Sequence, residues 1–255
     1  MPDPHQREAG YMTRITSLVA ALILVVGGGA YLTLSSPEPD AALPALGMAG
    51  AQTAEEDAGE PMAAEDVPEY ALGADDAPVT VVEYASFTCP HCRTFHEGPL
   101  ERLKEEYIDT GKVKLIYREV YFDRFGLWAA MVARCGARAV AGTEGETPAE
   151  ERATKRYFAI VDMLYAQQSE WTRGNDAAEV AGNLRRIGKT AGLTEDQLES
   201  CLTDEALAQA MVARYQENIE RDDISATPSF VIAGTTYSNM SYEEMSGILD
   251  EELGE

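Results

Sequence analysis

An apolar run that leads directly into a pair of cysteines limits the possible folds of this chain more than any other feature. Residues 78–86 (PVTVVEYAS) are rich in β-branched side chains, which is typical of a strand buried in a sheet. A Cys-x-x-Cys pair at 89–92 follows, and a helical pattern then continues to residue 111. A second strand is predicted over 112–120. Strand, helix and strand form a βαβ unit, whose sites lie at the carboxyl ends of its strands, where the cysteine pair falls.

The remainder of the chain is mostly helical in pattern. From about residue 125 to 221 apolar residues recur at helical spacing, and Thr147 is expected to cap one of these helices, with a proline at its first position. Two short strands, 229–233 and 235–237, and a helix capped by Ser241 complete the chain. The predicted fold class is therefore α/β, a small sheet with an all-helical subdomain inserted in its middle.

The composition fits a folded domain and argues against nucleic acid as a partner. The 255 residues are 45% hydrophobic and 25% charged, which is the balance of an ordinary globular protein. The 44 acidic residues outnumber the 20 basic ones, and the resulting net charge of -24 would repel the phosphate backbone of a duplex. We therefore expect no nucleic-acid partner.

The N-terminal part predicts export. Residues 15–34 form an apolar run of about 20 residues without charge, long enough to span a bilayer as a helix. Arg7 and Arg14 precede it and acidic residues follow it, so the N-terminus should stay in the cytoplasm while the rest is translocated. Residues 1–34 thus hold either a membrane anchor or a signal segment that is cleaved near Ala51. We favour the anchor, because the run is long and Ala51 lies far downstream.

Residues 35–70 are predicted to form an acidic, flexible linker. They contain no Lys or Arg and almost no aromatic residues, and Ala, Pro, Gly, Glu and Asp dominate them. Such a composition cannot bury enough apolar surface to fold, and repulsion between its carboxylates would keep it extended. The folded domain is expected over 71–255.

The motif Cys89-Pro90-His91-Cys92 has the chemistry of a redox centre. A cysteine that begins a helix faces unsatisfied N–H groups and the positive end of the helix dipole, which lower its pKa. Pro90 suits the first helical turn, and His91 can add positive charge or a hydrogen bond to the sulfur. Cys89 would then attack, or be attacked at, a substrate sulfur to give a mixed disulfide, and Cys92, one turn deeper, would resolve it. This exchange needs no cofactor, and we expect none.

A zinc site is the alternative for the same residues. Cys89, Cys92 and His96 have a plausible ligand spacing. A fourth ligand is missing and the chain has no second Cys-x-x-Cys, so we expect no metal.

Two segments of the chain resemble a known family. Residues 81–92 (VVEYASFTCPHC) are similar to the active-site strand and helix of DsbA-type thioredoxin-fold oxidoreductases. Residues 226–232 (ATPSFVI) resemble the segment in which that family has a cis-proline beside the dithiol. The resemblance covers roughly 71–253 and implies a thioredoxin-like fold with an inserted helical subdomain.

The same resemblance assigns roles to three further residues. Pro228 would be cis and would present the backbone of Thr227 to a substrate strand. Glu83 would be the buried acid that handles the proton of Cys92. From the residues alone, Pro228 could equally be trans in an ordinary turn, since cis bonds are about 5 to 6% of X-Pro bonds, and Glu83 could lie in water. Thr227 also leaves the redox direction open, because strong oxidases of the family usually have valine there.

The other two cysteines are predicted to form a structural disulfide, Cys135–Cys201. An exported protein rarely leaves two thiols unused, and relatives with a similar helical insertion look to have a second bridge. The alternative is a pair of free, buried cysteines that act as small apolar side chains.

The sequence thus predicts an exported thiol-disulfide oxidoreductase with a redox-active Cys89–Cys92 disulfide. It would be periplasmic or otherwise extracytoplasmic, tethered to the inner membrane by residues 15–34. Its expected partners are unfolded or reduced exported proteins, which receive the disulfide, and a membrane protein that reoxidises it. A disulfide isomerase or reductase on the same scaffold and a non-enzymatic peptide-binding module remain as alternatives.

Overall fold

The computed structural model describes residues 62–255. The apolar run 15–34 and linker residues 35–61 lie outside the described residues. From residue 62 onward, none of the helices combines the length and the apolar character that crossing a bilayer requires. The described chain opens with a short 3-10 turn, η1 (Ala64–Asp66).

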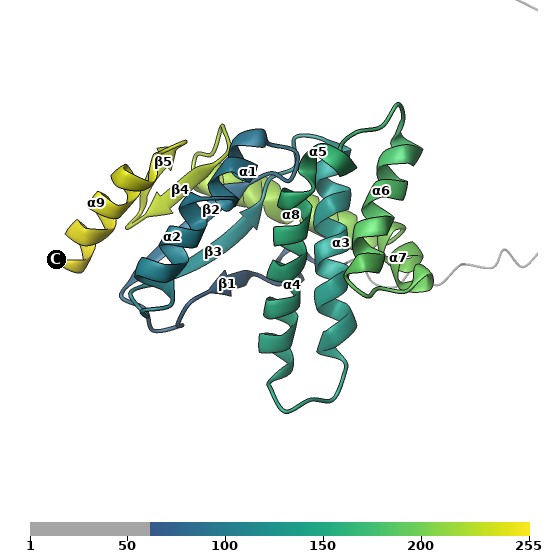
Figure 1. Ribbon diagram of the computed structural model, residues 1–255, viewed down its shortest axis with the longest axis horizontal. Coiled ribbons are helices and arrows are strands. Elements are labelled where there is room, and N and C mark those ends of the chain that lie inside the picture. Colours follow the sequence, from purple (N-terminus) through teal and green to yellow (C-terminus); the bar gives the residue numbers. More distant parts are fainter. Residues whose placement is uncertain (1–61) are drawn as a thin grey trace, which may run out of the picture. The chain divides into compact units, whose positions relative to one another are not determined.

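A five-stranded sheet forms one part of the fold, in the order β1-β3-β2-β4-β5 (Figure 1). Its central strand, β2, pairs in parallel with β3 and antiparallel with β4, and the other pairings are antiparallel. The strands are β1 (Tyr70–Leu72), β2 (Val79–Ala85), β3 (Val113–Glu119), β4 (Ser229–Ile232) and β5 (Thr235–Ser238). The β-branched run predicted to be a buried strand is therefore the centre of the sheet.

The helical stretch that follows the cysteine pair is divided into three pieces, which the sequence pattern did not predict. They are α1 (Pro90–His96), α2 (Pro99–Leu103) and the π-helical turn η2 (Lys104–Ile108). Pro99 has no N–H to donate to the preceding turn, and Gly98 before it has left the helical region with φ -150°. The break separates α1, which begins after Cys89, from α2.

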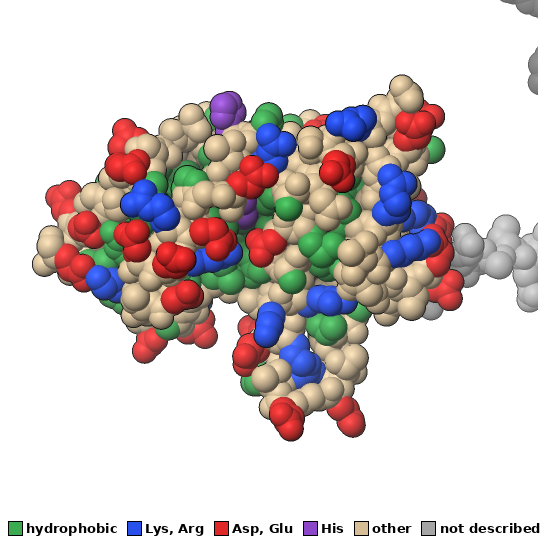
Figure 2. Space-filling model, in the orientation of Figure 1, with side chains coloured by type: hydrophobic (Ala, Val, Ile, Leu, Met, Phe, Trp, Pro, Cys, Tyr) green, Lys and Arg blue, Asp and Glu red, His purple; other side chains and the backbone are tan. Residues whose placement is uncertain are grey.

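The sheet buries apolar side chains on one side under α2 and the C-terminal helix α9 (Tyr242–Leu253). Leu100 and Leu103 of α2 and Met245 of α9 are at most 1% exposed in this core. Helix α9 begins at the predicted cap, where Ser241 and Glu244 form a capping box. Figure 2 shows acidic side chains spread over α9 and the outer face of α2.

The chain between β3 and β4 forms the predicted all-helical insertion, which confirms the fold class. Its long helices α3 and α4 run side by side as a hairpin (Figure 1). The helices are α3 (Arg124–Ala141), α4 (Ala149–Ala166), α5 (Gln168–Trp171), α6 (Ala177–Thr190), α7 (Glu195–Leu202) and α8 (Glu205–Arg221).

The predicted start of α4 is wrong by one residue. Pro148, rather than Thr147, occupies the cap position, and no side chain caps the helix. The guanidinium of Arg152 instead donates to the carbonyl oxygens of Thr147 and Thr143. An arginine inside the helix thus binds the turn that precedes it, an interaction that the capping pattern does not reveal.

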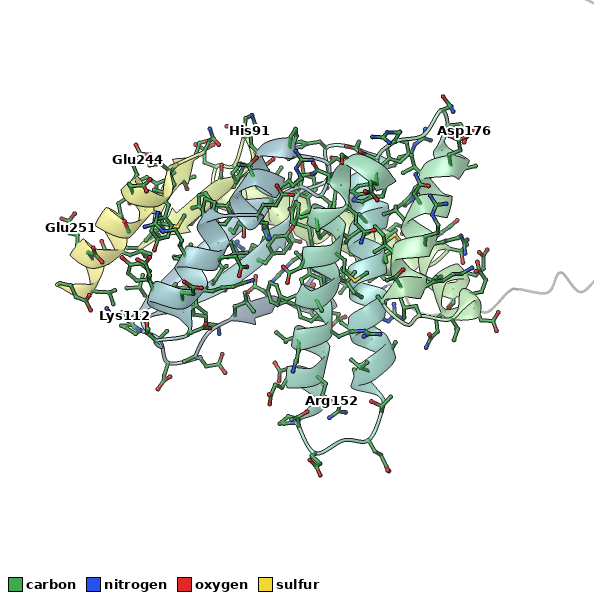
Figure 3. All side chains as sticks on the ribbon, viewed as in Figure 1. His91, Lys112, Arg152, Asp176, Glu244 and Glu251 are labelled. Atoms are coloured by element: carbon green, nitrogen blue, oxygen red, sulfur yellow. A yellow bond between two sulfur atoms is a disulfide. The ribbon has the colours of Figure 1, made fainter. Side chains whose placement is uncertain are left out.

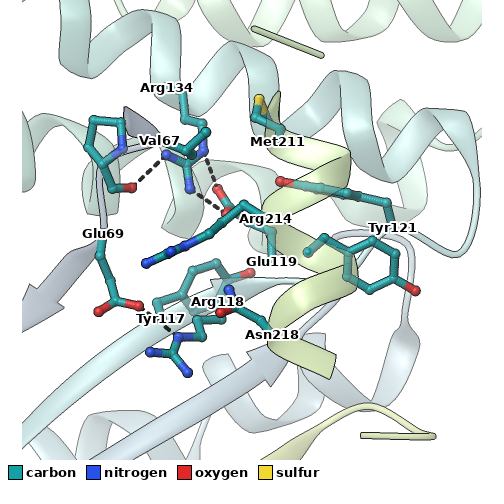
Figure 4. Close-up of a pocket in the computed structure, with 12 residues that line it drawn as sticks. Val67, Glu69, Tyr117, Arg118, Glu119, Tyr121, Arg134, Met211, Arg214 and Asn218 are labelled. Carbon is teal, nitrogen blue, oxygen red and sulfur yellow. Dashed lines mark hydrogen bonds and ion pairs between the residues drawn. The ribbon is translucent and has the colours of Figure 1, made fainter. Parts of the chain in front are cut away.

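Hydrogen bonds between polar side chains tie the insertion to the sheet. Arg134 of α3 donates to both carboxylate oxygens of Glu119 at 2.9 and 2.5 Å, and to the carbonyl of Pro68 at 2.8 Å (Figure 4). Tyr157 of α4 donates to the same carboxylate at 2.5 Å. At the far end of the insertion, the buried Tyr84 of β2 bonds to the side chain of Asp222.

Within the insertion, Cys135 of α3 and Cys201 of α7 are joined in a disulfide, with their Cα atoms 6.1 Å apart. Both residues are buried, at 7% and 4% exposure. The bond therefore crosslinks the first helix of the insertion to a helix 66 residues further along the chain.

Candidate active site

The cysteine pair lies where the central strand ends and the first helix begins. Cys89 is the N-cap of α1 with an extended backbone, and Pro90 takes the first helical position. The carbonyl of Cys89 accepts the first helical hydrogen bond, from Arg93 N at 3.2 Å. His91 is exposed at the edge of the molecule beside α1 (Figure 3). The strand thus delivers Cys89 to the surface, and the helix carries Cys92 inward.

The two thiols have opposite electrostatic environments. A hydrogen bond from the Cys92 thiol is the main cause that lowers the pKa of Cys89 to about 5, and it outweighs the burial that opposes it. Hydrogen bonding from Thr227 and from the N–H groups of Cys92 and His91 acts in the same direction. Burial, together with the nearby Cys89, raises the pKa of Cys92 well above its ordinary value. Near neutral pH the pair is therefore one thiolate and one buried thiol.

The segment before β4 faces the cysteines. The Thr227–Pro228 peptide bond is cis, and Pro228 is buried. The carbonyl oxygen of Thr227 lies 3.3 Å from Cys89 Sγ, within hydrogen-bonding distance of the thiol form. The structure thus brings together two segments that are 138 residues apart in the chain.

Glu83 lies inside the protein and not in water. Its side chain is 0% exposed, and its Oε1 atom lies 2.9 Å from Nε2 of His96, whose side chain is 2% exposed. His96 comes from the last turn of α1, one helical turn after Cys92. The sequence suggested His96 only as a metal ligand, although its spacing from Cys92 could have indicated a place in the site. Across residues 62–255, no three His, Cys, Asp or Glu side chains cluster as metal ligands.

The insertion also contributes side chains to the site, which sequence reasoning missed. Gln168, at the start of α5, is 5% exposed and donates to the carbonyls of Phe87 and Cys89 at 2.8 and 2.9 Å. Tyr165 of α4 stacks on the His96 ring, with centroids 4.1 Å apart, and its hydroxyl is 2.8 Å from that of Tyr117. No local motif marks these residues, because their roles depend on how the insertion packs against the loop.

Comparison with known proteins shows the family to which this chain belongs. The family described as thioredoxin matches residues 65–251, nearly the whole described chain. The chain belongs to the thioredoxin family. Among solved structures, alpha-DsbA1 of Wolbachia pipientis superposes with a TM-score of 0.61 and 26% identity, covering 76% of this chain and 96% of that one. The fold is thus that of a thioredoxin-family protein of the DsbA type, as the resemblance implied.

Curated relatives of this thioredoxin-family chain carry names of disulfide chemistry. A protein of Rickettsia bellii named as a protein-disulfide oxidoreductase is 29% identical over 184 residues, which are 72% of this chain and 64% of the relative. Disulfide bond formation protein D of Bacillus subtilis is 26% identical over 183 residues, covering 71% of this chain and 76% of the relative. The match thus spans less than two thirds of the Rickettsia bellii protein.

Proposed function

We propose that the chain is an exported thiol-disulfide oxidoreductase that introduces disulfides into other proteins through Cys89 and Cys92. The observation that carries this proposal is the contrast between a half-buried Cys89 with a pKa of about 5 and a buried Cys92 with a raised pKa. A purely structural thiol pair needs no such contrast, whereas a dithiol that exchanges disulfides does. The names of the relatives support the same chemistry.

The exchange would proceed in two displacements. A substrate thiolate attacks Cys89 Sγ of the enzyme disulfide, the Cys89–Cys92 bond breaks, and Cys92 leaves with the electron pair and takes up a proton. A second substrate thiolate then attacks the substrate sulfur of the mixed disulfide and expels Cys89 as a thiolate. The substrate is oxidised by two electrons and the enzyme is reduced to the dithiol. The low pKa of Cys89 makes it a good leaving group in the second step.

Several groups around the sulfurs have roles in this proposal. The Thr227 carbonyl, beside Cys89 and fixed by Pro228, is placed to accept a hydrogen bond from an extended substrate segment. Pro90 starts the helix, and the exposed His91 lies two residues after Cys89. Glu83 is the acid that exchanges the proton of Cys92.

The same electrostatics support a direction of electron flow. A stabilised Cys89 thiolate favours the reduced enzyme, so the disulfide form is an oxidant. We therefore propose an oxidase, reoxidised by a membrane protein, rather than an isomerase or reductase. The equilibrium of Cys89–Cys92 with glutathione tests this: a potential more reducing than the glutathione couple would contradict it, and a refolding assay with a scrambled substrate separates isomerase activity.

Export and tethering rest on the sequence of residues 15–34. The proposal places the folded domain outside the cytoplasm, where disulfides persist, with the acidic linker between it and the membrane. Protease added to intact spheroplasts should cleave the domain, and alkaline carbonate should leave the full chain in the membrane fraction. Release of a shortened domain would indicate a cleaved signal segment instead.

The activity itself is tested with two serine variants in oxidative refolding of a reduced substrate. Cys89→Ser should abolish turnover, whereas Cys92→Ser should accumulate a mixed disulfide between Cys89 and the substrate. Both exchanges are nearly isosteric, so each variant serves as the other's control for folding. If Cys89→Ser keeps full refolding activity, the chain is a peptide-binding module and the dithiol is incidental.

A further inference from the structure

Cys92 must gain and lose a proton in each catalytic cycle, although it is sealed from water. The residue is 0% exposed, and burial raises its pKa, so the thiolate it becomes on leaving Cys89 is a strong base. In reoxidation the same proton has to be removed before Cys92 can attack Cys89 of a mixed disulfide. A proton acceptor inside the protein is therefore needed next to Cys92.

One buried ionisable pair includes a residue of the same helix as Cys92. Glu83 and His96 share a 2.9 Å hydrogen bond between Oε1 and Nε2. His96 follows Cys92 by four residues in α1, so the two side chains occupy the same buried face of the helix. Tyr165 stacks on the His96 ring with centroids 4.1 Å apart, and after burial the charges of Cys92 and Glu83 both contribute to raising its pKa.

The other groups that face the His96 ring stay neutral. Tyr165 from α4 stacks on the ring at 4.1 Å, and Tyr117 from β3 meets it edge-on at 5.6 Å. Burial raises the pKa of both tyrosines well above the ordinary value, so neither hydroxyl ionises in the range where the enzyme would work. Phe95 is the remaining ring in contact with His96.

The two carboxylate oxygens of Glu83 differ in their hydrogen bonding. Oε1 is held by His96, whereas Oε2 is buried and has no hydrogen-bond partner among residues 62–255. A carboxylate held by one oxygen presents the other in a fixed direction. A buried carboxylate oxygen without a partner costs free energy, and a catalytic role is one explanation for such an atom in a native structure.

We propose that His96 is a positioning residue of the disulfide exchange, which fixes Glu83 through Oε1 so that Oε2 exchanges the proton of Cys92. This rests on the proposed function and adds to it a residue outside the Cys-Pro-His-Cys motif. When Cys92 leaves Cys89 as a thiolate, Glu83 gives it a proton and becomes the carboxylate. When Cys92 attacks Cys89 Sγ of a mixed disulfide, Glu83 takes the proton back and the partner leaves as a thiolate. Charge and protons balance within the site.

The test isolates the step in which Cys92 acts. Reduced protein is mixed with excess oxidised glutathione, quenched with acid, and analysed by mass spectrometry, which separates the glutathione mixed disulfide from the internal disulfide. The variants are His96→Leu, which removes the hydrogen bond to Glu83, His96→Gln, whose amide can still donate to Oε1, and Glu83→Gln. Glu97→Gln, next in sequence and exposed, is the matched control.

We expect the mixed disulfide of His96→Leu to resolve at least about 10-fold more slowly near pH 7, with a rate that rises in proportion to hydroxide. Glu83→Gln should behave alike, because both variants lack an oriented acceptor. His96→Gln should lie within about 3-fold of the natural protein, and Glu97→Gln should match it. Formation of the mixed disulfide depends on Cys89 and should not change in any of them.

The inference is overturned if His96→Leu resolves with the natural rate and pH profile, or if His96→Gln is as slow as His96→Leu. A purely structural role would lower the melting temperature of His96→Leu without changing the pH slope, which also counts against it. If the natural protein forms the mixed disulfide but never resolves it, the proposed function itself is wrong. His96→Gln supplies the answer if His96→Leu does not fold.

Discussion

Gln168 donates a hydrogen bond of 2.9 Å to the main-chain carbonyl of Cys89, although 79 residues separate the two in the chain. The same amide nitrogen donates to the carbonyl of Phe87 at 2.8 Å. The insertion, which lies outside the thioredoxin part of the fold, therefore holds the loop that carries Cys89. Because Cys89 also caps α1, this one side chain connects the position of the sulfur to the packing of α5.

Gln168→Leu should destabilise the protein by about 1 to 3 kcal/mol, because it leaves the buried carbonyl of Phe87 without a partner. The carbonyl of Cys89 keeps its bond from Arg93 N, so α1 should still form. Urea unfolding measures the change in free energy. Gln167→Leu, at the adjacent and less buried position, is the control and should cost less than about 0.5 kcal/mol. Equal losses of stability at the two positions would show that the hydrogen bonds of Gln168 do not stabilise the protein.

Cys89 should titrate alone, with a midpoint near pH 5, while Cys92 stays protonated. Hydrogen bonding from Cys92 lowers the pKa of Cys89 to about 5, and burial raises that of Cys92. The ultraviolet absorbance of the thiolate, measured as reduced minus oxidised protein, follows the transition. Cys89→Ser should remove it. A midpoint above about pH 8 would contradict the assignment, since that is the range of an ordinary thiol.

The same shift predicts how the stability of the reduced protein depends on pH. The pKa of Cys89 is lower in the folded state than its ordinary value of 9.0. The thiolate therefore stabilises the folded reduced form, and this stabilisation is complete at pH values above 9.0. This stabilisation is lost as the pH falls through about 5. The oxidised form has no such group. The free energy of unfolding of the reduced form, relative to the oxidised form, should therefore decrease from about pH 7 to about pH 4.

The sequence predicted the elements that local patterns define. The roles of Glu83 and Pro228 came from the resemblance to a known family. Residues 78–86 identified β2, and the cap at Ser241 identified α9, because side-chain type and spacing decide both. The buried state of Glu83 and the cis bond at Pro228 do not follow from spacing. They depend on a sheet that pairs Glu83 with Phe230, 147 positions away in the chain.

The contributions of the insertion could not be predicted for a different reason. Tyr165 and Gln168 reach the cysteines only because α4 and α5 pack against the loop before α1, and nothing in their own neighbourhood indicates this. His96 is an intermediate case, since its helical spacing from Cys92 was visible but its partner, Glu83, lies on another element. The threonine cap was also missed: Pro148 occupies the cap position, and the carbonyl of Thr147 accepts a hydrogen bond from Arg152.

Arg134→Met should destabilise the protein by about 3 to 5 kcal/mol, which is the usual effect of leaving one charge of a buried pair alone. Glu119 is 6% exposed, and without Arg134 its carboxylate would keep only the hydroxyl of Tyr157 among the contacts described above. Tryptophan fluorescence in urea measures the loss. The double variant Arg134→Met, Glu119→Gln removes the stranded charge and should recover part of the stability. A double variant no more stable than the single one would contradict this explanation.

Removal of the Cys135–Cys201 bond should lower the free energy of unfolding by up to about 4 kcal/mol, the loop-entropy value for a crosslink of this length. The bond joins residues 66 apart, so its loss frees a long segment of the unfolded chain. The comparison is made in a background with Cys89→Ser and Cys92→Ser, so that Cys135→Ala and Cys201→Ala together remove the remaining disulfide. Because alanine is close in size to a buried cysteine, the packing of α3 against α7 should change little. A double variant as stable as its background would show that the crosslink does not stabilise the insertion.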